Sequence, residues 1–149
     1  MAKVKLLNYR EASKEARLIF DDIMTTRKSA YVNNIWRALA NYPPMMRRFW
    51  DQMKAVMIRP SKIDPLTKEM IYLAVSITNN CEYCINSHIA AARSKGMDDE
   101  ILCELNEIVG LANHGNKLTQ GLQVDIDKSL HDYEGETPWS VSSDADQKS

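Results

Sequence analysis

Residues 79–88 read Asn-Asn-Cys-Glu-Tyr-Cys-Ile-Asn-Ser-His, a Cys-x-x-Cys-x-x-x-His motif placed where a helix is expected to begin. On a helix, Cys81, Cys84 and His88 are three and then four residues apart, so their side chains share one face. The positive end of the helix dipole stabilises a thiolate near the N-terminus. Two thiols with an imidazole one turn further on can carry out thiol redox chemistry, and they can also bind a metal ion.

The segment before the motif is expected to form a second helix that packs against the first. Asp64 and Pro65 are typical of an N-cap and of a first helical position. The apolar spacing that follows them predicts a helix to about Thr78. Asn79 and Asn80 then make a short turn, with Asn80 as the cap of the next helix, so the two helices should run antiparallel.

This arrangement brings Glu69 toward the motif. Glu69 lies about ten residues before the turn and His88 about eight after it, or about 15 and 12 Å along the two helices. We therefore expect Glu69 to orient His88 and raise its basicity, so that His88 takes the proton of Cys84. The helix dipole alone favours Cys81 as the more acidic thiol. Proximity to the base favours Cys84 as the attacking thiol, so the two arguments conflict.

Helical periodicity extends along almost the whole chain, and no segment has the alternation of a strand. The expected helices cover about residues 13–27, 33–40, 43–59, 65–78, 81–95, 98–109 and 116–130. Ile108 and Cys103 are expected on the inward side of their helix. The chain is thus predicted to be all-α, with one domain over residues 1–133 and a polar, disordered tail over 134–149.

Composition excludes several classes of protein. The 149 residues are 44% hydrophobic and 26% charged, with a net charge of −1, so the chain has no basic surface typical of nucleic-acid binding. No apolar run approaches the length of a membrane span, and the first ten residues lack the apolar core of a secretory signal. Three cysteines, two of them close together, do not make a disulfide scaffold. We expect a cytoplasmic protein whose thiols are reduced between turnovers.

The motif and its flanks resemble the alkylhydroperoxidase D-like branch of the carboxymuconolactone decarboxylase superfamily. The resemblance rests on Glu69, the twelve-residue step to Cys81, and the Cys-x-x-Cys-x-x-x-His run. It extends over about residues 9–130 and includes these flanking stretches: Lys68-Glu69, Leu73-Ala74-Val75-Ser76, Ala90-Ala91-Ala92-Arg93, Gly96-Met97 and Asn33-Asn34-Ile35-Trp36-Arg37-Ala38-Leu39-Ala40-Asn41-Tyr42-Pro43. Tyr83 stands between the cysteines, where the best-studied members have histidine.

This resemblance implies a helical bundle of about six to seven helices. It also implies an obligate homo-oligomer, a trimer or a hexamer. Cys84 would be the peroxidatic thiol, Cys81 the resolving thiol, and Glu69 with His88 the proton relay. The implied activity is a peroxidase for hydrogen peroxide or organic hydroperoxides, reset by an external dithiol or disulfide reductase and needing no metal, flavin or haem. Members that lack the cysteines are decarboxylases, so we do not carry decarboxylation over to this chain.

Other interpretations of the motif stay open. The same dithiol could serve a disulfide reductase or redox partner with negligible peroxidase activity. A non-enzymatic, zinc-stabilised oligomeric binding module would need a fourth ligand besides Cys81, Cys84 and His88. Candidates for that ligand are Cys103, His114 and His131. A c-type haem is disfavoured because Ile85 stands where that attachment motif needs histidine, and a thioredoxin domain because the βαβ pattern is missing.

Overall fold

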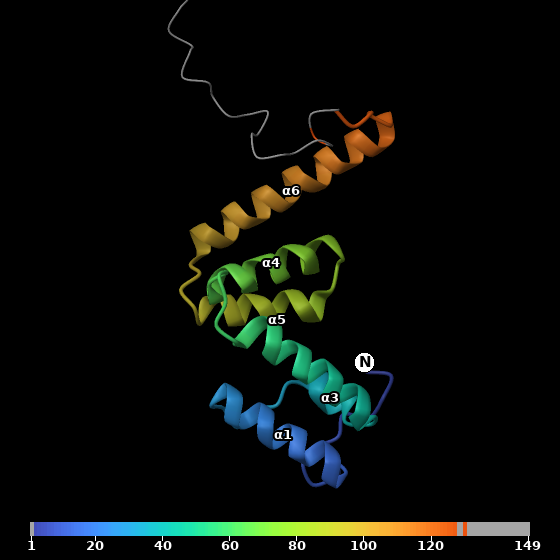
Figure 1. Cartoon of the computed structure of the whole chain (residues 1–149), viewed down its shortest axis with the longest axis vertical. Helices are drawn as coiled ribbons and strands as arrows, with labels where there is room; N and C mark the ends of the chain where they lie inside the picture. Colours follow the sequence, from blue (N-terminus) through green and yellow to red (C-terminus); the bar gives the residue numbers. More distant parts are fainter. Residues whose placement is uncertain (1, 128–129, 131–149) are drawn as a thin grey trace, which may run out of the picture. The chain divides into compact units, whose positions relative to one another are not determined.

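The computed structural model of the chain describes residues 2–127 and 130, and within this part there are six α-helices, one π-helix and no strand. The helices are α1 (Lys14–Arg27), α2 (Asn34–Leu39), α3 (Pro43–Met53), the π-helix η1 (Lys54–Ile58), α4 (Pro65–Thr78), α5 (Glu82–Arg93) and α6 (Asp99–Leu122). The all-α prediction is therefore confirmed (Figure 1). The chain divides into two compact units, Met1–Asp98 and the residues from Asp99 onward.

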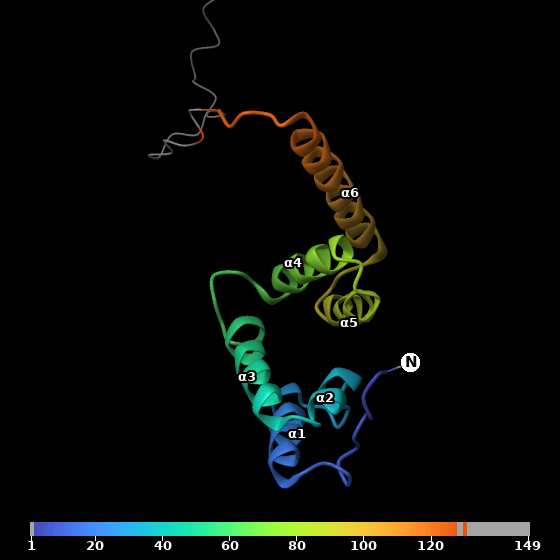
Figure 2. The ribbon, with the colours of Figure 1, turned by 90° about the vertical axis from the view of Figure 1, so that its right-hand side faces the viewer.

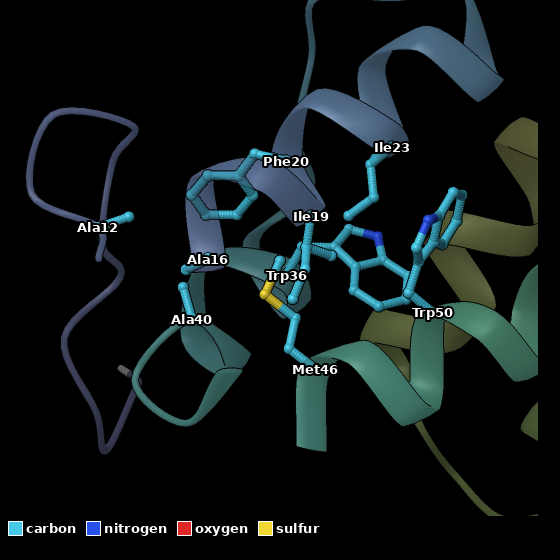
Figure 3. Packing of buried hydrophobic residues seen from close by; sticks show 9 residues of the cluster. All are labelled: Ala12, Ala16, Ile19, Phe20, Ile23, Trp36, Ala40, Met46 and Trp50. Carbon is cyan, nitrogen blue, oxygen red and sulfur yellow. The ribbon is translucent and has the colours of Figure 1, made fainter. Parts of the chain in front are cut away.

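The hydrophobic core of the first unit lies between α1, α2 and α3 (Figure 3). Ser13 begins α1 by accepting the amide N–H of Ala16, as an N-cap serine does. The apolar spacing of α1 then places one stripe of side chains inward. The buried cluster consists of Ala12, Ala16, Ile19, Phe20, Ile23, Trp36, Ala40, Met46 and Trp50. Trp36 and Trp50 meet edge to face with ring centroids 5.3 Å apart, a favourable aromatic geometry.

A charged cluster joins α1 to α3 and the π-helix at the edge of this core. Oδ2 of Asp22 accepts hydrogen bonds from Nε1 of Trp50 at 3.0 Å and from Nζ of Lys54 at 2.6 Å. Arg47 contributes an ion pair at 3.3 Å, and Thr26 donates to the other carboxylate oxygen. Burial alone would raise the pKa of Asp22, but the hydrogen bonds from Lys54, Trp50 and Thr26 lower it. The ionised carboxylate is therefore part of the folded structure.

Asp22→Asn is expected to lower the free energy of unfolding by about 2 kcal/mol at neutral pH, since Trp50 and Lys54 lose their charged acceptor. Because the folded pKa of Asp22 is lowered, its contribution is present above the unfolded value of about 4 and lost as pH falls below it. Urea unfolding from pH 3 to 7 measures this. The matched control is Asp51→Asn, whose more exposed carboxylate pairs with the same Lys54 at 3.4 Å. Equal losses in both variants would contradict the expectation.

Helices α4 and α5 form the predicted antiparallel pair and lie side by side in Figure 1. Asp64 accepts the amide N–H of Thr67 and Pro65 occupies the first helical position, as the sequence predicted. The predicted cap of α5 is wrong. Asn80 adopts a left-handed conformation with φ of 55°, and Cys81 is the N-cap residue instead. Asparagine tolerates this conformation, so the turn uses Asn80 to reverse the chain.

Helix α6 corrects three expectations. It is continuous from Asp99 to Leu122, so the separate helix predicted over 116–130 is wrong. The side-chain amide of Asn113 donates a hydrogen bond to the Val109 carbonyl at 2.8 Å, so it bonds within the helix and does not interrupt it. Leu105 and Val109 are buried as expected, but Ile108 is 64% exposed. Cys103 is an exposed free thiol, because a helix that buries Leu105 and Val109 turns Cys103 to the other side.

The predicted tail over 134–149 lies outside the described residues, and the single domain over 1–133 stays a prediction. Figure 2 gives a second view of the same helices. Among the described residues, no helix combines the length with the apolar character that a membrane span requires.

Candidate active site

The two motif cysteines are joined at the start of α5. Cys81 and Cys84 form a disulfide with their Cα atoms 5.2 Å apart. The amide N–H of Cys84 also points at Sγ of Cys81, at 3.4 Å, so a sulfur atom takes the place of the usual N-cap oxygen. The motif therefore places the disulfide at the positive end of the helix dipole, where negative charge on sulfur is stabilised after reduction.

His88 and Glu69 are in direct contact across the α4–α5 pair. Nδ1 of His88 lies 2.7 Å from Oε2 of Glu69, and the side chains of both residues are about nine-tenths buried. Burial alone would raise the pKa of Glu69, but the hydrogen bonds and charges of His88 and Lys95 outweigh it and lower that pKa. Since an ionised carboxylate can only accept, Nδ1 carries the proton. Nε2 of the neutral imidazole then has a free lone pair that can act as a base.

Two further residues complete the surroundings of this pair. The ring of Tyr72 stacks on the imidazole of His88 with centroids 3.8 Å apart. Nζ of Lys95 lies 3.1 Å from Oε1 of Glu69, so both oxygens of the carboxylate have partners. Sequence reasoning missed both residues. Helical spacing contained the signal for Tyr72, which is three residues after Glu69 on α4, whereas Lys95 lies just beyond the end of α5 at Arg93.

Tyr83, the residue between the cysteines, contacts the N-terminal helices. Its hydroxyl oxygen accepts the amide N–H of Ile35, in the first turn of α2, at 3.2 Å. The ring is 45% exposed, so Tyr83 is not a core residue. The contact ties the disulfide turn to α2 within the first unit.

The structure thus places the four predicted site residues on two facing helices. Cys81 and Cys84 lie at the N-terminus of α5, His88 lies one turn after Cys84 on the same helix, and Glu69 comes from α4. Both cysteines are half-buried, so neither is enclosed in the hydrophobic core. Among residues 2–127 and 130, no group of three or more His, Cys, Asp or Glu side chains is arranged to hold a metal ion. The arrangement suits a dithiol–disulfide cycle with an adjacent proton acceptor.

Comparison with known proteins gives the family. Residues 43–126 match the model of the carboxymuconolactone decarboxylase family. The crystal structure of the alkylhydroperoxidase AhpD core from Rhodospirillum rubrum ATCC 11170 is similar, with 49% sequence identity and a TM-score of 0.85. That alignment covers 88% of this chain and 98% of the solved one. No curated protein is significantly similar. The chain therefore belongs to the carboxymuconolactone decarboxylase family, in its alkylhydroperoxidase D-like branch.

Proposed function

We propose that this protein is a thiol-dependent peroxidase that reduces hydrogen peroxide or organic hydroperoxides. The observation that carries the proposal is the disulfide at the N-terminus of α5, with His88 one turn after Cys84 on the same helix and bonded to Glu69 of α4. A redox-active cysteine needs a thiolate, and this site offers both a helix N-terminus and a base. The similarity to a solved alkylhydroperoxidase core supports the same class of reaction.

In the proposed cycle His88 first acts on Cys84. Nε2 of His88 takes the thiol proton of Cys84, one helical turn away, while Glu69 holds the imidazole through Nδ1. The thiolate sulfur of Cys84 attacks one peroxide oxygen and the O–O bond breaks. The departing oxygen takes the proton from His88 and leaves as water or an alcohol. Cys84 is then a sulfenic acid, oxidised by two electrons.

Cys81 completes the cycle. Its sulfur attacks the sulfur of the Cys84 sulfenic acid, the S–O bond breaks, and water leaves with the proton of Cys81. The product is the disulfide present in the structure. An external dithiol or disulfide reductase then supplies two electrons and two protons to regenerate both thiols. The amide N–H of Cys84 at Sγ of Cys81 favours a thiolate on Cys81, which suits the resolving step.

Intact-mass measurement tests the cycle. Fully reduced protein treated with one equivalent of cumene hydroperoxide is expected to lose two hydrogens within seconds to minutes, because Cys81 traps the sulfenic acid as a disulfide. In Cys81→Ser the sulfenic acid on Cys84 should persist and take up dimedone. An unchanged mass after several minutes would rule out the peroxidase. An adduct that formed only in Cys84→Ser would exchange the roles of the two cysteines.

One rival function keeps the same disulfide. A half-buried disulfide whose Cys81 sulfur lies at a helix N-terminus also suits exchange with other thiols, because a stabilised thiolate is a good leaving group. A disulfide reductase or redox partner would show fast exchange with a dithiol and negligible peroxide consumption. Measuring both rates on one preparation separates the two functions.

The proposal includes assembly with further copies of the chain. Large apolar side chains are exposed on α4 and, in the second unit, on α6, and exposed apolar surface is typical of protein–protein contacts. They include Ile71, Val75, Ile108, Leu111, Leu118 and Leu122. We propose a homo-oligomer, a trimer or a hexamer, that works with a separate electron donor.

A further inference from the structure

The carboxylate of Glu69 has two partners, one on each oxygen. Oε2 lies 2.7 Å from Nδ1 of His88 and Oε1 lies 3.1 Å from Nζ of Lys95. The side chain of Glu69 is 9% exposed, so water contributes little to stabilising its charge. The imidazole and the ammonium therefore share the stabilising effect of a single negative charge.

Lys95 is held in place by the end of α5. The helix ends at Arg93, and the amide N–H of Lys95 donates to the Ala92 carbonyl at 2.9 Å. Nζ of Lys95 also donates to the Ala91 carbonyl at 3.3 Å, so the ammonium bridges the helix end and the Glu69 carboxylate. The next residue, Gly96, has φ of 103°, which turns the chain away after Lys95. The Lys95 side chain is 31% exposed, and its ammonium is held at the edge of the site by the Glu69 carboxylate and the Ala91 carbonyl.

We propose that Lys95 is a positioning residue that limits the basicity of His88 by sharing the charge of Glu69. A buried carboxylate with no other partner would strongly favour the imidazolium form of His88, which has no lone pair for the proton of Cys84. The positive charge of the Lys95 ammonium disfavours a second positive charge on the His88 imidazole. The ammonium also binds Oε1 of Glu69, so that Oε2 bonds to Nδ1 of His88. Its use in catalysis rests on the proposed function, but the charge sharing itself does not.

The other ionisable groups around the pair do not replace Lys95. They are Tyr72 on α4, Tyr83 at the start of α5 and Arg27 on α1, while Cys81 and Cys84 are joined in the disulfide; Lys54 is the charged residue of η1, which packs against α4. Arg27 interacts electrostatically with Glu69, but its guanidinium lies over the rings of Trp36 and Trp50 and donates to Asn33 at 2.6 Å. Lys54 pairs with Asp22 and Asp51.

An NMR titration of the His88 imidazole tests the inference. The full chain is used in its disulfide form, where Cys81 and Cys84 do not titrate, and a His88→Gln spectrum assigns the signal. Lys95→Met is expected to raise the titration midpoint of His88 by about half a unit to one unit at low salt. Lys95→Arg should restore the midpoint of the unchanged protein. The matched control is Lys68→Met, whose ammonium donates to the Arg59 carbonyl and not to Glu69.

The activity of the reduced protein gives the second readout. On the acid side of the pH–rate profile for reaction with peroxide, the pH of half-maximal rate should rise by the same amount in Lys95→Met. In Lys95→Arg it should return to the value of the unchanged protein. An unmoved His88 midpoint would overturn the inference, even in a fully active peroxidase. A moved midpoint in a protein that does not consume peroxide would support the charge sharing and overturn the proposed function. If Lys95→Met unfolds, Lys95→Gln removes the charge but keeps a hydrogen-bond donor, and the same midpoint decides.

Discussion

Replacing Cys84 with serine is expected to reduce peroxide consumption to the background rate, a loss of at least about a thousandfold. Serine keeps the size of the side chain, but its hydroxyl stays protonated at neutral pH and is a far weaker nucleophile toward peroxide oxygen. Steady-state consumption of cumene hydroperoxide with excess dithiothreitol measures the loss. Far-ultraviolet circular dichroism shows whether the helices are intact.

Cys103→Ser is the matched control for this substitution. Cys103 is a free, exposed thiol on α6 and has no role in the proposed cycle, so its removal should leave the rate unchanged. Cys81→Ser should differ from both variants, because its first turnover survives while the disulfide can no longer form. A Cys84→Ser protein that kept a tenth of the activity or more would contradict the assignment of Cys84 as the attacking thiol.

His88→Ala is expected to slow the first oxidation of the reduced protein by about 10²- to 10⁴-fold, the usual contribution of a general base. The imidazole is buried, lies 2.7 Å from Glu69 and is stacked on Tyr72, and the substitution removes the proton acceptor of the proposed cycle. Stopped-flow mixing with hydroperoxide measures the rate constant. At pH values above the ordinary range of a thiol the deficit should shrink, because hydroxide then forms the thiolate without the base.

Two further variants separate the base from its support. Glu69→Gln should slow the reaction less than His88→Ala, because the imidazole survives but loses the carboxylate that fixes its Nδ1 proton. His114→Ala, which removes an exposed histidine of α6, should leave the rate unchanged. If His88→Ala and Glu69→Gln both reacted at the normal rate, the proton relay would be wrong even for a true peroxidase.

Sequence reasoning predicted the fold well where local signals were strong. Ser13, Asp64 and the prolines gave helix starts that the structure confirms. Sequence reasoning placed helix boundaries wrongly where helix-forming and helix-breaking residues occur close together. One helix was expected to end near residue 109 and another to begin near 116, yet α6 runs through Gly110 and Gly115, since a glycine weakens a long helix by only about 1 kcal/mol. Ile108 and Cys103 were wrongly expected to face inward. Helix α6 carries apolar side chains on several faces, so its sequence does not show which face is buried.

For the site, the spacing of the motif predicted which side chains would meet. Glu69 and His88 were placed at similar levels by counting residues from the turn, and the structure brings them into contact. Lys95 and Tyr72 were missed because charged and aromatic residues on a helix are most often surface or packing residues. Lys95 is identified as a partner only by the structure, in which Oε1 of the buried Glu69 carboxylate lies 3.1 Å from Nζ of Lys95. The sulfur cap of α5 was missed because asparagine is the commoner cap.

The short turn between α4 and α5 has a consequence for how this protein can evolve. Surface connections normally tolerate added or lost residues. Here the turn between Thr78 and Cys81 consists of Asn79 and Asn80 alone, and Asn80 already adopts a left-handed conformation, so an extra residue would change how α5 lies against α4. The contact between Glu69 and His88 across the helix pair would then be lost, while the disulfide, which lies within one turn of α5, would still form. Length variation should therefore be as strongly selected against in this turn as substitution is at the cysteines themselves.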